Sequence, residues 1–174
     1  MKRAKRKNYF LGIHVHMKKD DQNYPGLIDK EQYQVFVFVC PGNLPFNFAL
    51  HPWFVVNNRG SISRWEVLIQ KTMSDTSWGH LHRNFFPPFN GIEIISFSRK
   101  YTWKGKLLGK IEGDVAKRIA EYIECSPTTY PYRNKYFLSG PNSNTYVQWV
   151  LCNFPEFNVV LPWNSFGKNY NTHN

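Results

Sequence analysis

The segment from Gln32 to Cys40, QYQVFVFVC, constrains the fold of this chain more than any other. It is rich in β-branched and aromatic residues, and Pro41-Gly42 follows it directly. This combination is typical of a β-strand that ends in a turn. We expect the strand to be central in a sheet.

Four further segments have strand character. The turn signal Asn57-Asn58-Arg59-Gly60 predicts a hairpin, and Pro52 at a strand start holds His51 extended. The segment WGHLHRN, residues 78–84, is expected to be a loop. The predicted strands are 51–56, 62–69, 92–97 and 106–111, with a short strand at 159–161.

Two segments have helical periodicity. In the first, Asp114 is a suitable N-cap, apolar residues recur every four positions, and the helix is expected to end before Pro127. The second, 142–152, begins after Gly140-Pro141 among good capping residues. Its apolar stripe is Tyr146, Val147, Val150 and Leu151. The order of strands and helices predicts an α+β fold, with an antiparallel sheet packed against two main helices.

Composition predicts a globular protein of the cell interior. The chain has 174 residues, 42% hydrophobic and 17% aromatic, enough to bury one core. No apolar run approaches the about 18 residues needed to cross a bilayer, and the N-terminus lacks a signal-peptide core. Three cysteines without paired spacing fit a reducing compartment. We therefore expect a cytoplasmic protein.

The net charge of +10 is concentrated at the N-terminus, where five of the first seven residues are Lys or Arg. We expect residues 1–8 to form a basic flexible tail and residues 9–174 to form a single domain. Such a run binds nucleic acid or an anionic membrane surface in some proteins, and in others it is only a solvated tail.

The most distinctive segment is Tyr136 to Leu151, YFLSGPNSNTYVQWVL. Its polar residues crowd the predicted start of a helix, where free backbone N–H groups and the helix dipole favour an anion or a nucleophile losing its proton. A purely structural capping cluster has the same sequence pattern, because Ser and Asn are the best N-caps.

The stretch GPNSNTYVQWVL, together with HPWFVV from His51 to Val56, resembles a bacterial family of unknown function whose signature is a GPNSNT motif. That family in turn resembles the circularly permuted papain-like fold of NlpC/P60 peptidases and lecithin–retinol acyltransferases. In those enzymes a His at a strand start comes first, a polar orienting residue follows, and a Cys at a helix N-terminus comes last. The resemblance implies that His51 is the base and that Ser143 stands where those enzymes have Cys.

A serine nucleophile requires a nearby base, because its hydroxyl is far less acidic than a thiol. His51 would be that base, and Glu66 or His80 would orient its ring, although a surface or salt-bridging role for Glu66 is the simpler interpretation. Backbone N–H groups at the helix start, with the amides of Asn142 or Asn144, would stabilise an oxyanion. We also name Trp53, in the HPWFVV motif, as a candidate binding residue.

Metal and cofactor sites find little support in the sequence. The pairs His14-x-His16 and His80-x-His82 place two rings on one face of a strand, but no Cys or carboxylate completes a recognised spacing. The tryptophans are expected to lie mainly in the core, and neither a phosphate-binding loop nor a known hydrolase motif is present. We expect no metal and no cofactor.

The leading functional prediction is a hydrolase or acyltransferase acting on an amide, ester or thioester of a small molecule, peptide or lipid. The first alternative is a non-catalytic binding module that keeps the groove. The second is a nucleic-acid-associated protein that uses the basic tail.

Overall fold

The computed structural model describes residues 24–96 and 99–170 and has an α+β fold, as predicted. After the short η1 (Tyr24–Leu27), five strands form an antiparallel sheet in the order β4-β3-β2-β1-β7. These are β1 (Tyr33–Pro41), β2 (Leu50–Asn58), β3 (Ser61–Ser74), β4 (Ser77–Arg83) and β7 (Lys106–Glu112). A separate hairpin consists of β5 (Asn90–Ser96) and β6 (Arg99–Lys104).

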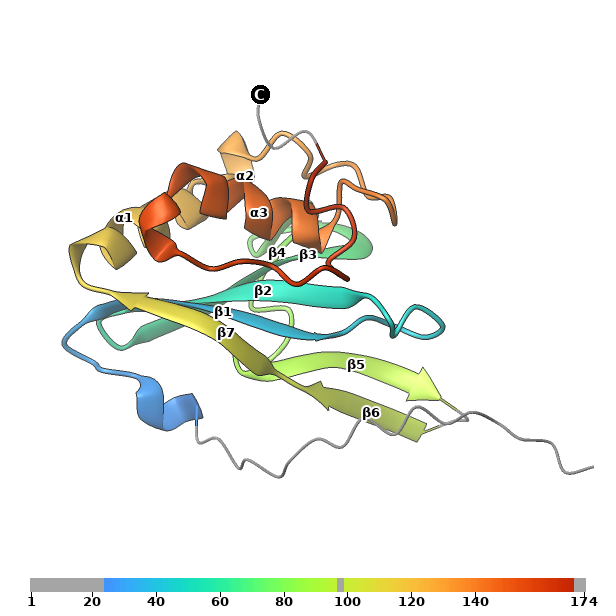
Figure 1. Cartoon of the computed structure of the whole chain (residues 1–174), viewed down its shortest axis with the longest axis horizontal. Helices are drawn as coiled ribbons and strands as arrows, with labels where there is room; N and C mark the ends of the chain where they lie inside the picture. The colour runs from blue at the N-terminus through green and yellow to red at the C-terminus, as the bar shows by residue number, and fades with distance from the viewer. Residues whose placement is uncertain (1–23, 97–98, 171–174) are drawn as a thin grey trace, which may run out of the picture.

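The sheet is covered on both faces (Figure 1). One face carries α1 (Asp114–Glu124), the single turn α2 (Ser126–Thr129) and α3 (Ser143–Asn153), followed by η2 (Pro155–Phe157). The other face carries the β5–β6 hairpin. β1 pairs with β2 and β7, and every residue from Gln34 to Cys40 is buried. The expected central strand is therefore confirmed, and its lack of a polar face follows from having apolar layers on both sides.

Side-chain alternation divides the core in two. On the helix face, Phe54 and Val56 of β2 pack with the α1 and α3 stripes. On the hairpin face, Trp53 and Val55 pack with Phe36 and Phe38 of β1. Because successive strand residues point to opposite faces, His51 shares the hairpin face with Trp53, and their rings stack with centroids 6.0 Å apart. This assignment determines which side of the sheet each site residue occupies.

The β2–β3 hairpin has the predicted turn. Arg59 and Gly60 both have positive φ, 49° and 91°, as a tight two-residue hairpin turn requires. The Asn57 side-chain oxygen accepts a hydrogen bond from the Gly60 N–H at 2.7 Å. The predicted hairpin is therefore confirmed.

Helix starts differ by a residue from expectation. Gly113, with φ of 78°, is the N-cap of α1, so Asp114 is its first residue rather than its cap. For α3 the cap is Asn142, and the predicted stripe is buried. No helix in the described part of the chain has the length and hydrophobicity that a bilayer crossing requires.

Two sequence predictions are wrong. The segment containing His80 and His82 is not a loop but β4, which pairs with β3. Residues 159–161 form no strand; they belong to the C-terminal segment that runs back along the helix layer after η2 (Figure 1). Val159 packs onto bare Gly109 of β7, where an added Cβ would lie 2.6 Å from its Cγ2. This contact covers part of the Val159 side chain without strand pairing.

Candidate functional site

The centre of the candidate site is a buried histidine–glutamate pair. His51 lies near the start of β2, and its Nε2 lies 2.8 Å from Oε2 of Glu66 on β3. Glu66 has no solvent exposure and His51 retains 7%. An ionised carboxylate can only accept, so it favours the His51 tautomer that carries its proton on Nε2 and donates it to Glu66. This tautomer leaves the lone pair of Nδ1 free. Glu66 thus contacts the His51 ring from the interior and is not on the surface, and its orienting role stays a prediction.

A buried arginine completes this cluster. Arg64, two residues before Glu66 on β3, holds both carboxylate oxygens: its Nη2 donates to Oε2 at 2.8 Å and its Nε lies 2.7 Å from Oε1. The guanidinium also lies over the Trp53 ring, 4.2 Å from its centroid, and donates to the carbonyls of Pro87 and Asn90. One charge-assisted hydrogen bond and one ion-pair contact thus place the positive charge of Arg64 directly against the carboxylate.

The environment keeps Glu66 ionised. Burial alone would raise the pKa of the Glu66 carboxyl, but the hydrogen bond from His51 and the charge of Arg64 outweigh burial and hold this pKa below its usual value. Cys40 is directly across the β1–β2 ladder from His51. Burial raises the pKa of its thiol to about 12, so Cys40 remains a neutral thiol at physiological pH.

A pocket of about 650 Å³ opens beside His51. The β2–β3 ladder ends at the pair Phe54–Trp65, although β2 begins at Leu50 and β3 continues to Ser74. The pocket is lined by residues from the parts of β2 and β3 that do not pair with each other, including His51 and Leu68. The separation of the strands therefore lets residues from opposite faces of the sheet line one pocket.

The GPNSNT motif forms the start of α3 and borders this pocket. The Asn142 side-chain oxygen accepts from the backbone N–H groups of Asn144 and Thr145, and the Thr145 hydroxyl accepts from the Asn142 N–H, which completes a capping box. Asn142 Nδ2 donates to carbonyls that include those of Leu138 and Phe166. The capping prediction is confirmed.

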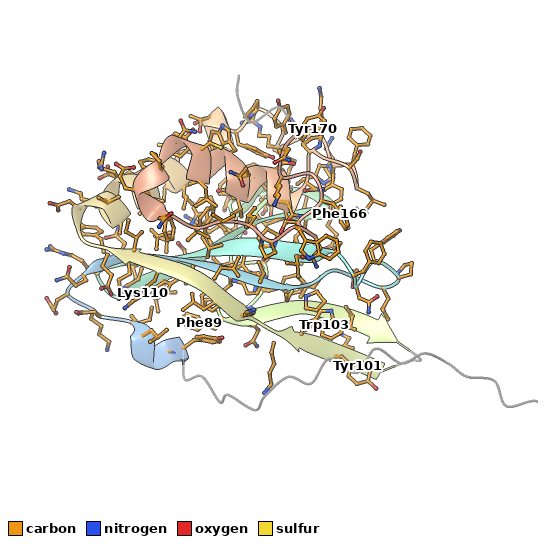
Figure 2. The ribbon with its side chains drawn as sticks, viewed as in Figure 1. Phe89, Tyr101, Trp103, Lys110, Phe166 and Tyr170 are labelled. Atoms are coloured by element: carbon orange, nitrogen blue, oxygen red, sulfur yellow. The ribbon has the colours of Figure 1, made fainter. Side chains whose placement is uncertain are left out.

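The same motif ties distant segments together. Asn144 Nδ2 donates to the carbonyl of Leu50, next to His51, and to that of Phe166, both near 3 Å. The Thr145 hydroxyl donates to the Gly167 carbonyl at 2.7 Å. Figure 2 shows Phe166 beside the end of the sheet from which the β1–β2 loop extends. Through these internal hydrogen bonds the two asparagines hold the loops around the pocket in place, and their binding role stays a prediction.

Ser143, the first residue of α3, lines the pocket together with His51. In residues 24–96 and 99–170, no hydrogen bond joins its hydroxyl to the His51 ring, and no acceptor is found for its backbone N–H. The helix packs on the face opposite to that of His51. The structure therefore brings the two residues to one pocket without direct contact, and leaves a free N–H at the helix N-terminus.

His80, the other candidate orienting residue, has a different place. Its Nδ1 faces the carbonyls of Leu68 and Gln70, where the β3–β4 register shifts, and its ring lies against Tyr136. Nε2 of His82 faces the Gln70 carbonyl as well. Both imidazoles thus lie next to carbonyls at the irregular part of the ladder, and His80 forms no hydrogen bond with His51 among the described residues.

Trp53 is fully buried, and its Nε1 donates to the Pro88 carbonyl, so it supports Arg64 and His51 from within the core. No group of three metal-ligand side chains converges anywhere in the described ranges. The pair His14-x-His16 and the basic residues 1–8 lie outside the described residues.

Sequence reasoning missed Arg64 and the pocket. Arg64 could have been identified from the sequence, because it lies two residues before Glu66 on one predicted strand and residues two apart share a face of the sheet. The pocket had none, since it depends on where the pairing of two strands stops.

Comparison with known proteins supports one assignment. No curated protein and no solved structure matched the chain. A family model described as protein of unknown function (DUF3750) matches residues 32–170. This match confirms the predicted membership of a family of unknown function, and it does not extend to papain-like enzymes. The chain therefore belongs to the DUF3750 family.

Proposed function

We propose that this domain is a hydrolase or acyltransferase that acts on an amide, ester or thioester, with Ser143 as the nucleophile and His51 as its base. The observation that carries the proposal is that His51, oriented by the buried Glu66, lines the same pocket as Ser143. A nucleophile, a base and an orienting group at one cavity are the parts that acyl transfer requires.

The chemistry follows from the available atoms. His51 Nδ1 takes the proton of the Ser143 hydroxyl as Oγ attacks the carbonyl carbon, and the Ser143 backbone N–H donates to the oxyanion. The imidazolium then gives this proton to the leaving amine, alcohol or thiol, and an acyl-serine remains. Water, or an acceptor alcohol or amine, attacks the acyl-serine with His51 as base, which releases the acyl product and restores the hydroxyl. Glu66 stabilises the imidazolium throughout.

A non-catalytic binding module is the second candidate. It is favoured by the placement of Ser143 and His51 on opposite faces of the sheet and by the lack of a hydrogen bond between them in the described residues. Catalysis requires the two side chains to come into contact when substrate binds, as catalytic contacts in ligand-free sites often do.

Substitution of the two residues distinguishes the candidates. Hydrolysis of p-nitrophenyl acetate should fall to background in both Ser143→Ala and His51→Ala. Matched controls are Ser139→Ala, which removes another pocket serine, and His80→Ala, which removes the histidine next to the β3 carbonyls. Both controls should retain turnover. Equal rates in all four variants, or no turnover by the original protein on a panel of esters, thioesters and amides, would leave the binding module as the function.

A further inference from the structure

The pocket that holds His51 also constrains what enters it. None of the eighteen lining residues within the described ranges 24–96 and 99–170 is Asp, Glu, Lys or Arg. Burying an unpaired charge in such a site is costly, because nothing replaces the water that solvated it. The part of a ligand that occupies this pocket is therefore uncharged.

Most of the lining is apolar and comes from separate parts of the chain. The β1–β2 loop contributes Leu44, Phe46 and Phe48. Leu68 and Ile69 of β3 form another wall, and Ile92 of β5, the start of β2, the chain around α3 and the C-terminal segment also contribute. The volume of about 650 Å³ lies within the range of small-molecule sites.

The apolar lining continues from the core to the surface. Leu68 is 7% exposed, whereas Phe48 is 61% and Ile69 66% exposed. Three phenylalanines form an edge-to-face row at the surface: the centroids of Phe46 and Phe48 are 6.1 Å apart, and those of Phe48 and Phe166 are 5.9 Å apart. Contiguous exposed apolar side chains of this kind mark a binding surface.

We infer that the site takes an elongated, uncharged apolar chain, the alkyl or acyl chain of a single-chain amphiphile. The carbonyl carbon, or the carbon that carries the polar group, would lie at His51 and Ser143. This inference rests on the proposed function for the position of the carbonyl, and on the lining alone for the chain. A lining that runs from buried Leu68 to exposed Phe48 suits a long group better than a compact one.

Binding of neutral 1-alkanols to the full-length Ser143→Ala variant tests the inference without any turnover. Each buried methylene is worth about 0.8 kcal/mol, so affinity should rise about 15-fold from 1-hexanol to 1-octanol, measured by titration calorimetry. An affinity that does not change with chain length would overturn the inference. Tighter binding of the capped dipeptide N-acetyl-Leu-Leu-amide than of 1-octanol would do so too, since it would indicate a peptide site.

A matched pair of surface variants locates the chain. Ile69→Asp places a charge in the pocket lining, whereas Met73→Asp places one on the same strand outside it; the two original side chains are 66% and 72% exposed. The first should abolish the gain with chain length and the second should preserve it. Identical binding by both variants would refute the location.

The outcomes separate this inference from the proposed function. If binding depends on chain length but the unsubstituted protein hydrolyses no ester, the apolar site is supported and the proposed enzymatic function is rejected. Turnover of acetyl esters with no preference for longer chains would keep the enzyme and overturn the substrate class.

Discussion

Replacement of Arg64 by Met is expected to be among the most damaging single changes in this protein. The guanidinium has no solvent exposure and neutralises Glu66 through contacts of 2.7 and 2.8 Å. Removing one partner of a buried ion pair leaves the other charge uncompensated and typically costs about 3–5 kcal/mol. Arg64→Met should therefore lower the free energy of unfolding by that amount.

Urea denaturation followed by circular dichroism measures this loss. The matched control is Arg118→Met, because Arg118 pairs with Glu156 at 3.1 Å with both side chains about half exposed. Such surface pairs contribute about 1 kcal/mol or less. The double variant Arg64→Met/Glu66→Gln removes both buried charges and should recover part of the loss. Equal costs for Arg64→Met and Arg118→Met would refute the reasoning that Arg64 supports an ionised Glu66.

Two further predictions follow from pKa shifts. The folded protein holds the pKa of Glu66 below its unfolded value of about 4.3, so the stabilisation is complete above that pH and is lost as the pH falls toward the folded pKa. Glu66→Gln should therefore flatten the pH dependence of Tm as the pH falls below about 4.3, and an unchanged slope would contradict this. Burial that raises the pKa of Cys40 to about 12 should protect it, so a disulfide reagent at pH 8 should modify only exposed Cys125 and Cys152 in the folded protein and all three thiols in urea, whereas rapid native modification of Cys40 would contradict its burial.

The sequence predicted the elements whose signals are local. The segment containing Val35 to Cys40 has strand propensity along its whole length, and the Asn142 cap marks the start of α3. β4 follows β3 through a two-residue turn, but it was missed because Gly79 lowers its strand propensity and its ladder with β3 is irregular between Val67 and Thr72. β6 and the single turn α2 were not anticipated either, and α2, with 4 residues, is too short for a helical pattern.

The candidate site was predictable in its residues but not in its geometry. His51 was named from the resemblance carried by the HPWFVV and GPNSNT segments, and Glu66 because it lies on the next predicted strand. Their faces of the sheet follow from alternation, which also places His51 away from α3. The meeting of His51 and Ser143 at one pocket depends on the point where β2 and β3 separate, and neither strand pattern specifies that point.

The central claim, that Ser143 and His51 act together on an acyl group, is tested most directly by trapping the acyl-serine. The protein is mixed with p-nitrophenyl octanoate, quenched in acid within seconds, and analysed by intact mass and peptide mass spectrometry. The account predicts one octanoyl group per chain, located on Ser143, and its absence in both Ser143→Ala and His51→Ala. Octanoylation that maps to a lysine or to Cys125, or that persists at the same level in His51→Ala, would contradict the account.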